Sequence, residues 1–443
     1  MMRTSVLVIG GGPVGLTLSI LLARMKIDHQ VVESRLAPSP HPKARGISAR
    51  SMEIFRRLGL ESEIRAAGLP ADHVAFFRGK TLDDPNYTRT VVDSSRSGHT
   101  PAPGLLCSQD ALEGVLSVHA GDRVRRGVRL ISFEQNDSEV SATVRDERTG
   151  EESALRADWL IGCDGAHSTV RTGVGITMTG PTGLNEFLSV RFEAPLGAVV
   201  ADRASASYFL TGGGGFLAID NDRQWIYQHP LQGRDPGDID LIARIRSGVG
   251  ISDLPVRISG TATWRMDARS ADNYRSGRVL LAGDAAHTVP PTGGHGMNVG
   301  IGDADNLAWK LAAVITGAAP ESLLDTYESE RRPLARRVID ISTANARARD
   351  SYRIDDELLL GTAYRDSDTL IRTDGYVPAA AVGDRLPHAW LPDGRSTLDL
   401  VGPGHVLLTG PQLPEDLRRL CGLSPTTALL VRPDGHIAAR LYA

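Results

Sequence analysis

The segment over residues 5–33 constrains the fold most strongly. It reads SVLVIGGGPVGLTLSILLARMKIDHQVVE, a short apolar run followed by the glycine spacing G-x-G-x-x-G. Apolar residues then recur at helical intervals, and HQVVE has the pattern of a second strand. The three glycines permit a tight turn, a close approach to a pyrophosphate and close packing of helix on strand. The segment therefore predicts a Rossmann-like unit that binds a dinucleotide. Its expected contacts are Gly10, Gly12, Pro13, Val14 and Gly15.

Glu33 ends the second expected strand, where an acidic side chain accepts hydrogen bonds from an adenosine ribose. A carboxylate there prefers a free ribose hydroxyl to a phosphorylated one, so the loop favours NAD or FAD over NADP. Ser34 and Arg35 follow directly and are included among the expected contacts. A glycine-rich turn beside a surface glutamate is the alternative, and the strand–turn–helix context argues against it.

Two later segments repeat the pattern of an apolar strand that ends in a polar loop. ADWLIGCDGAHSTVR (157–171) places Asp164 and then Arg171 after a strand, and GRVLLAGDAAHTVPPTGGHGMN (277–298) places Asp284 there. A dehydrogenase needs neither segment to bind its cofactor. Together the three motifs resemble the single-component flavin monooxygenases of the p-hydroxybenzoate hydroxylase type, and the resemblance covers essentially the whole chain.

The resemblance implies bound FAD, NADPH or NADH as co-substrate, and O2. Asp284 would accept hydrogen bonds from the ribityl hydroxyls, and Pro290 and Pro291 would hold a rigid backbone beside the ring. A helix from Met297 onward would direct its positive end at the flavin and stabilise the anionic reduced form. The residues expected to contact FAD in this segment are Gly283, Asp284, Pro291, Gly294, Gly296, Met297 and Asn298.

Two histidines of the same segment have separate expectations. His295 departs from the residues common at its place in the family; it either tunes the flavin or lines the pocket, or it is a spectator. His287 is expected to be structural, in a hydrogen-bonded turn.

Other positions match the family more loosely. A basic residue that contacts the flavin corresponds to Lys43 or Arg45, and the sequence leaves the register between them open. Gln109 matches a residue at a helix start that meets the ribityl chain. Asp164 resembles the aspartate of a motif shared by FAD and NAD(P)H, with Arg171 bracing its loop.

Alternating apolar runs from about 180 to 268 predict antiparallel strands with one buried face. In the resembling family such a sheet covers the substrate pocket above the flavin. The pocket candidates are Tyr208, Trp225, Tyr227, Trp264, Pro290 and Pro291, and a place in the core is the alternative for each aromatic residue. No second glycine loop follows a strand, so NAD(P)H is expected to bind transiently at the domain interface.

The expected fold class is α/β, with a Rossmann-like FAD-binding domain, an antiparallel-sheet substrate domain and a C-terminal thioredoxin-like domain. Residues 1–179 with 269–345 form the first, 180–268 the second, 346–379 a linker helix region and 380–443 the third. Because Cys421 is the only cysteine of the tail, redox chemistry there is not expected. A structural or oligomerisation role fits better.

The resemblance implies an FAD-dependent monooxygenase that hydroxylates a phenolic or polyketide-like ring through a flavin hydroperoxide. Baeyer–Villiger or epoxidation chemistry, reduction of isoprenoid double bonds, and a non-catalytic resistance protein that binds its ligand are the alternatives. A net charge of −4 offers no footprint for nucleic acid, and three widely spaced cysteines argue against a zinc site and for a reducing compartment. We expect a cytoplasmic protein without membrane contact or bound metal, capable of forming a homodimer; no catalytic side chain is identified.

Overall fold

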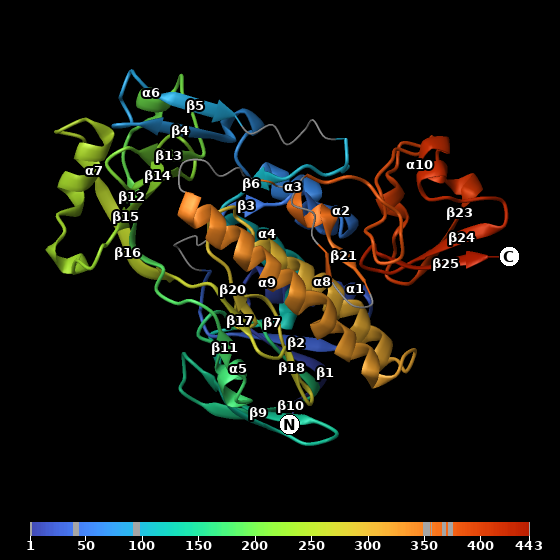
Figure 1. Cartoon of the computed structure of the whole chain (residues 1–443). Helices are drawn as coiled ribbons and strands as arrows, with labels where there is room; N and C mark the ends of the chain where they lie inside the picture. The colour runs from blue at the N-terminus through green and yellow to red at the C-terminus, as the bar shows by residue number, and fades with distance from the viewer. Residues whose placement is uncertain are drawn as a thin grey trace.

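The computed structural model describes residues 2–38, 44–91, 98–348, 355, 357–365, 369–370 and 375–442. Lys43 therefore lies outside the described residues. Figure 1 shows two sheet-containing parts and a C-terminal unit (375–442) at the right, with two long helices, α8 (Gly296–Ile315) and α9 (Asp325–Ala348), between them.

An eight-stranded sheet forms the core of the nucleotide domain, the name used here for this sheet and its helices. Its order is β18-β19-β10-β1-β2-β7, with β8 and β9 attached beyond β10. Parallel ladders join β1 to β2 and to β10, β10 to β19, and β2 to β7. The strands are β1 (Met2–Ile9), β2 (His29–Glu33), β7 (Val124–Arg126), β8 (Val128–Gln135), β9 (Val140–Asp146), β10 (Glu152–Gly162), β18 (Arg275–Ser276) and β19 (Val279–Leu281).

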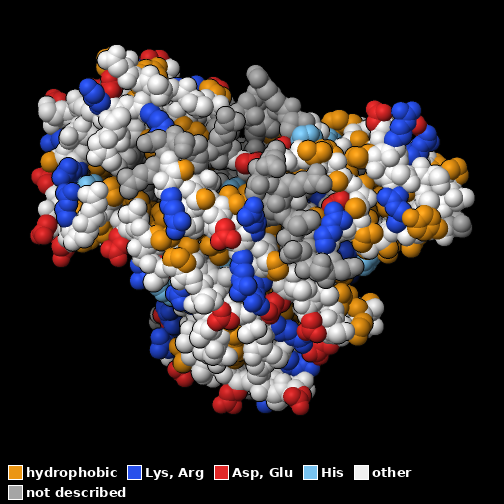
Figure 2. Space-filling view, in the orientation of Figure 1, with side chains coloured by type: hydrophobic (Ala, Val, Ile, Leu, Met, Phe, Trp, Pro, Cys, Tyr) orange, Lys and Arg blue, Asp and Glu red, His pale blue; other side chains and the backbone are white. Residues whose placement is uncertain are grey.

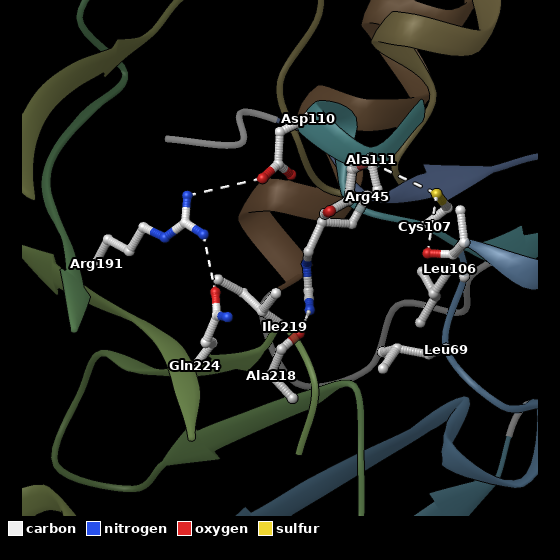
Figure 3. A pocket seen from close by; sticks show the side chains of 13 residues that line it. Arg45, Leu69, Leu106, Cys107, Asp110, Ala111, Arg191, Ala218, Ile219 and Gln224 are labelled. Atoms are coloured by element: carbon white, nitrogen blue, oxygen red, sulfur yellow. Dashed lines mark hydrogen bonds and ion pairs between the residues drawn. The ribbon is translucent and has the colours of Figure 1, made fainter. Parts of the chain in front are cut away.

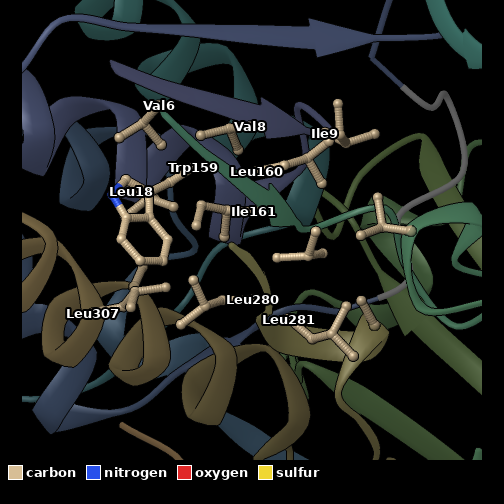
Figure 4. Packing of buried hydrophobic residues seen from close by; sticks show 14 of the residues in the cluster. Val6, Val8, Ile9, Leu18, Trp159, Leu160, Ile161, Leu280, Leu281 and Leu307 are labelled. Carbon is tan, nitrogen blue, oxygen red and sulfur yellow. The ribbon is translucent and has the colours of Figure 1, made fainter. Parts of the chain in front are cut away.

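Helices cover this sheet, and its central strands are buried on both faces, as is typical of parallel strands. Val6, Leu7 and Val8 are fully buried, and Figure 4 shows side chains of β1, β10 and β19 packed with Leu18 and Leu307. The carboxyl ends of parallel strands meet at one edge, so the three polar loops of the sequence converge there. The remaining helices of the domain are α1 (Pro13–Arg24), α2 (Ala49–Arg57), α3 (Glu61–Ala66), α4 (Gln109–Ala120) and α5 (Thr169–Gly173).

A seven-stranded sheet, with its helix α7 (Leu241–Val249), forms the sheet domain. Its order is β16-β12-β15-β14-β13-β4-β5, and every ladder is antiparallel except that between β13 and β4. Val190 faces Tyr227 across one ladder, and both belong to the core that packs against α7. The strands are β4 (Ala75–Gly79), β5 (Thr88–Val91), β12 (Asn185–Glu193), β13 (Ser207–Leu210), β14 (Gly215–Ala218), β15 (Gln224–Pro230) and β16 (Arg257–Met266).

Two of these strands come from outside residues 180–268, the range expected for the sheet domain. Strands β4 and β5 come from residues 75–91, which the sequence analysis placed in the FAD-binding domain. The parallel ladder between β4 and β13 recruits them into the sheet domain. Nothing in a five-residue apolar run shows which distant strand it will join, so this pairing has no local sequence signal.

The C-terminal unit contains a three-stranded antiparallel sheet of β23 (Val406–Thr409), β24 (Thr427–Val431) and β25 (Ile437–Tyr442), and the helix α10 (Glu415–Leu420). One face, with Leu408 and Leu429, packs into a small core. Leu407, on the opposite face, is exposed, and Figure 2 shows hydrophobic side chains gathered over this unit at the right. The described sheet is wholly antiparallel, so the thioredoxin-like assignment stays a prediction.

Short ladders connect the larger parts. They are formed by β3 (Gly46–Ile47) with β6 (Leu105–Leu106), by β11 (Met178–Thr179), β17 (Arg269–Ala271) and β20 (His287–Thr288), and by β21 (Ala363–Tyr364) with β22 (Thr369–Leu370). Among the described residues, no helix combines the length and the apolar character needed to cross a bilayer.

Candidate functional site: a convergence of three strand-end loops

The glycine loop lies between β1 and α1, as the spacing predicts. Gly10 has a φ of 106°, and a Cβ on it would overlap the carbonyl oxygen of Cys163. A Cβ on Gly15 would overlap the carbonyl oxygen of Gly10, so the helix approaches the strand as closely as backbone allows. A Cβ on Gly12 would meet nothing within 4 Å. Open space thus adjoins the helix N-terminus, where a pyrophosphate would be stabilised.

Pro13 and Val14 begin the first turn of α1 and complete the loop. Val14 packs toward Gly283 and Gly300, since a Cβ on either glycine would clash with its side chain. Helix α8 therefore lies directly against the glycine loop. This close packing explains why glycines occur at both positions.

Glu33 lies beside the glycine loop at the end of β2. Its Oε2 accepts a hydrogen bond from the Gly11 N–H at 2.7 Å, and its Oε1 accepts one from the Arg35 N–H at 2.8 Å. The Ser34 hydroxyl is 3.5 Å from Oε1 and contributes little. The carboxylate is thus held at the glycine loop, and the ribose contact expected of it stays a prediction.

Asp164 follows β10 and is joined to a short helix. Its Oδ1 accepts from the Ser168 hydroxyl and its Oδ2 from the Val170 N–H at 3.0 Å. Burial raises the pKa of Asp164, although these hydrogen bonds oppose the shift. Arg171 donates to the carbonyl oxygens of Ala166 at 2.8 Å and Ala285 at 2.9 Å. Arg171 therefore braces the Asp164 loop against the loop of Asp284.

Asp284 lies in a single 3₁₀ turn after β19, at the same sheet edge as Gly10 and Glu33. Its side chain is exposed and can face a bound ligand. Behind it the loop is anchored by His287, which is fully buried and lies 2.7 Å from Asp303 Oδ2. Arg331 donates to the other oxygen of Asp303 at 2.7 Å. His287 thus has the structural place expected for it.

The segment after β20 leads into α8. Pro290 is buried and Pro291 exposed, and Gly294 has a φ of 73° with open space where a Cβ would stand. Gly296 begins α8 and lies next to Val289, while Met297 packs toward Ile301 and the α2 side of the domain. The exposed backbone at Gly294 fits close contact with a flat ring.

Asn298 holds this segment in place, and His295 is buried in it. The Asn298 amide donates to the carbonyl oxygens of Gly46 at 2.9 Å and Gly294 at 2.7 Å, and its oxygen accepts from the Ser48 N–H. It therefore joins β3 to the glycine-rich loop, which local sequence does not reveal. His295 is buried, and burial lowers its pKa to about 4, so its imidazole is neutral at pH 7.

Gln109 begins α4 and Arg45 immediately precedes β3. The Gln109 amide donates to Glu113 Oε1 at 2.7 Å, and burial raises the pKa of that carboxyl. The Arg45 guanidinium crosses to the sheet domain, where it donates to the carbonyl oxygens of Ala206 and Ala218. The cofactor contact expected of Arg45 or Lys43 stays a prediction.

The pocket candidates divide between the two faces of the sheet domain. Tyr208, Trp225 and Tyr227 lie in the core that packs against α7. Trp264 lies on the opposite face, where its ring stacks on Phe187 at 4.6 Å between centroids and 12° between planes. This face looks toward the nucleotide domain, because Arg45 and Asp110 of that domain bond to Ser207 and Arg191 on it. Strand periodicity predicts the alternation and leaves open which set faces the flavin.

Comparison with known proteins identifies the family. The model of the FAD binding domain family matches residues 3–342. The chain belongs to this FAD-binding family. A relative from Streptomyces coelicolor, named as a polyketide hydroxylase, is 43% identical to this chain. The alignment covers 75% of this chain and 56% of that relative's length. Tetracenomycin A2 monooxygenase-dioxygenase of Streptomyces glaucescens is 35% identical over an alignment that covers 98% of this chain and 93% of that protein.

A solved ternary complex of aklavinone-11 hydroxylase with FAD and aklavinone has the same fold as this FAD-binding family member. It is 30% identical, with a TM-score of 0.87 over 99% of this chain and 96% of its own. The chain is therefore an enzyme of the class A flavin monooxygenase type, and FAD is its cofactor. The three strand-end loops fit FAD because they combine open glycine backbone, a helix N-terminus and two carboxylates at one sheet edge.

Proposed function

We propose that this flavin monooxygenase hydroxylates a flat, polycyclic aromatic substrate of the polyketide type, using NAD(P)H and O2. The single observation that carries the proposal is the stacked pair of Phe187 and Trp264 on the surface of the sheet domain that looks toward the nucleotide domain. The Trp264 indole N–H donates to Gln228 Oε1 at 3.1 Å, and the Gln228 amide donates to the Ser189 hydroxyl at 2.7 Å. Two aromatic faces next to an amide suit a planar ring that carries hydroxyl or carbonyl oxygens.

The strand register supports a flat ligand. Ser189 pairs with Gln228 on one side and with Ala262 on the other, and Gln228 pairs with Gly215. Short side chains therefore flank the amide along this row. Phe209 ends the row beyond Gly215, and Trp264 lies two residues from Ala262 at the other end. Relatives named for tetracenomycin A2 and aklavinone act on aromatic polyketides by their names, and this surface is compatible with the same class.

Bound FAD supplies the redox chemistry, with electrons from NAD(P)H and an oxygen atom from O2. The protein positions the substrate and excludes water. Phe187 and Trp264 would orient the ring, and the exposed residues Pro291 and Gly294 would border the cofactor. The N-terminus of α8 places unpaired N–H groups near Gly296, where they would stabilise negative charge on the reduced cofactor.

Turnover with a panel of aromatic polyketides and simple phenols tests the proposal. NADH or NADPH oxidation and O2 uptake are measured with and without each compound, and ¹⁸O2 traces oxygen into product. The proposal requires stimulated oxidation and a product that gains one oxygen atom on the ring. Binding without stimulated oxidation would favour the ligand-sequestering alternative. Oxygen inserted beside a ketone would favour Baeyer–Villiger chemistry.

We further propose that the protein is cytoplasmic and forms a homodimer. A cytoplasmic location is supported by Cys107, Cys163 and Cys421, which are all free thiols. A homodimer is tested by light scattering of the FAD-loaded protein, which would give twice the monomer mass if the expectation holds.

A further inference from the structure

A cluster of buried side chains lies behind the loop that carries Asp284. It contains Asp303 of α8 and both Tyr327 and Arg331 of α9. None of the three is among the described residues that line the cavity between the nucleotide domain and the sheet domain, into which Arg45 reaches (Figure 3). The cluster therefore belongs to the strand-end loops and is separate from the space between the two domains.

The cluster holds two backbone groups that precede Asp284. The Tyr327 hydroxyl donates to the carbonyl oxygen of Leu281 at 2.8 Å. Asp303 Oδ2 accepts a hydrogen bond from the Gly283 N–H at 3.1 Å. Since Gly283 is the residue immediately before Asp284, a shift of either bond would change the direction in which the Asp284 side chain points.

Gly283 needs such a restraint because of its own conformation. Its φ is 62°, in the left-handed region that glycine adopts most readily, and glycine leaves the backbone free to take many other conformations. Val14 of the glycine loop occupies the space beside it, since a Cβ on Gly283 would lie 2.9 Å from the Val14 side chain. The bond to Asp303 therefore fixes a backbone position that has no side chain of its own to hold it.

Asp303 is itself held by charged and polar partners. His287 Nε2 lies 2.7 Å from its Oδ2, and the Arg331 Nε–H donates to its Oδ1 at 2.7 Å. Burial opposes the ionisation of Asp303, but Arg331 and His287 hold its pKa below its usual value. Arg331 also donates to the carbonyl oxygen of Val299, in the first turn of α8, at 2.8 Å. The ionised carboxylate thus joins the Asp284 loop to the first turn of α8.

We propose that Asp303, together with Tyr327, positions the Asp284 carboxylate for FAD and is required for tight FAD binding. Both side chains are fully buried, so they act through the backbone of residues 281–284 and not by contact with the cofactor. An ionised acceptor gives a stronger hydrogen bond than a neutral one, which makes Asp303 the more important of the two. The proposal rests on FAD as the cofactor and on the expected contact of Asp284 with it, whichever ring the enzyme hydroxylates.

A double-mutant cycle on FAD affinity tests this proposal. The full-length protein is freed of FAD and titrated with FAD, and the change in flavin fluorescence gives Kd. We expect Asp303→Asn and Asp284→Asn each to raise Kd by about tenfold, because each weakens hydrogen bonds to a charged group. Because Asp303 acts through Asp284, the double variant should also raise Kd by about tenfold, whereas independent effects would multiply to about a hundredfold.

The cycle separates failure of the positioning role from failure of the cofactor contact. Multiplied effects in the double variant, or a wild-type Kd in Asp303→Asn, would overturn the positioning role while leaving the Asp284 contact intact. A wild-type Kd in Asp284→Asn would overturn the contact itself and the proposal with it. ADP, which lacks the flavin and the ribityl chain, should bind Asp303→Asn as tightly as the wild type. Equal losses of ADP and FAD affinity would show general loosening of the nucleotide domain and overturn the proposal.

Asp305→Asn is the matched control on the same helix. Asp305 is a second buried carboxylate of α8, and it pairs with Arg50 and Arg57 of α2. We expect this variant to leave the Kd for FAD unchanged. A loss of FAD affinity equal to that of Asp303→Asn would show that any broken ion pair on α8 has the same effect, and would overturn the proposal.

Tyr327→Phe serves if Asp303→Asn does not fold. It removes only the hydroxyl that donates to the Leu281 carbonyl oxygen and keeps the aromatic ring in the core. We expect it to raise the Kd for FAD in the wild-type background and to cause no further rise in the Asp284→Asn background. An unchanged Kd in the first background, or an equal rise in both, would overturn the proposal.

Discussion

Arg385 of the C-terminal unit and Glu53 of α2 form an ion pair that is almost wholly buried, although 332 positions separate them in the sequence. The Arg385 Nε–H donates to Glu53 Oε2 at 2.9 Å, and a second N–H donates to Oε1. Glu53 also accepts from the Thr100 hydroxyl at 2.7 Å. The pair therefore connects the C-terminal unit to α2 of the nucleotide domain.

We expect Arg385→Ala to lower the free energy of unfolding by about 3 kcal/mol, because it leaves the Glu53 carboxylate buried without its main partner. Burial alone would raise the pKa of Glu53, and Arg385 and Arg50 hold it below its usual value. Arg395→Ala is the matched control, since Arg395 and Asp393 are both largely exposed, and it should lower stability much less than Arg385→Ala. Urea unfolding measures both variants. Equal losses would contradict the role of the buried pair.

Acid stability should depend on Glu330 of α9. Burial opposes its ionisation, but bonds from Arg432 at 2.7 and 2.9 Å and the charge of Lys310 lower the pKa of Glu330 to about 2. Because the folded-state pKa lies below the usual value of 4.5, the stabilisation is complete above pH about 4.5 and is lost as the pH falls toward 2.

Glu330→Gln tests this pH dependence. We expect the variant to be less stable than the wild type at pH 7, by an amount on the order of 3 kcal/mol. The difference between the two should shrink as the pH falls from about 4.5 toward 2, measured by urea unfolding. A difference that is constant over this range would show that Glu330 contributes without its charge.

The glycine loop gives a test with a matched control inside the chain. Gly15→Ala should abolish FAD retention, because the new Cβ would overlap the Gly10 carbonyl oxygen and displace the N-terminus of α1. Gly114→Ala lies in the exposed middle of α4 and meets nothing within 4 Å, so it should keep FAD and raise stability by about 0.5–1 kcal/mol. FAD content and unfolding midpoints measure both. Normal FAD content in Gly15→Ala would contradict the close packing.

Substitutions on the two faces of the sheet domain should have different effects on KM and on stability. Trp264→Ala should raise the KM for an aromatic substrate by about tenfold, since it removes an aromatic contact from the surface that looks toward the nucleotide domain. Trp225→Phe should lower stability and leave KM unchanged, because Trp225 is fully buried in the core against α7. A larger KM effect for Trp225→Phe than for Trp264→Ala would assign the pocket to the other face.

The sequence predicts those parts of the fold that depend on residues close together in the chain. The strand–glycine–helix spacing around Gly10 predicts the βαβ unit and the edge at which Glu33 and Asp284 meet. Strand periodicity predicts an antiparallel sheet after residue 180, yet it cannot show which face looks toward the flavin. Periodicity therefore leaves Tyr208 open between the pocket and the core, and in the structure Tyr208 lies in the core.

The sequence could not predict the hydrogen bonds that join segments far apart in the chain. The contact of Arg45 with the carbonyl oxygens of Ala206 and Ala218 joins segments more than 150 positions apart through backbone atoms, which carry no side-chain signature. The Asn298 amide likewise bonds to Gly46 and Gly294 backbone. Such bonds depend on where elements pack, so they follow from the tertiary structure and not from residue type.

Flavin content and oxygen transfer, measured on one preparation, test the central claim that three strand-end loops hold a single FAD for aromatic hydroxylation. We expect the purified chain to be yellow with one FAD per chain, and substrate to stimulate NAD(P)H oxidation with oxygen incorporated into the ring. Asp284→Ala should lose FAD or release the oxygen as hydrogen peroxide. A colourless chain that takes up no FAD, or Asp284→Ala with normal FAD content and full coupling, would contradict the account.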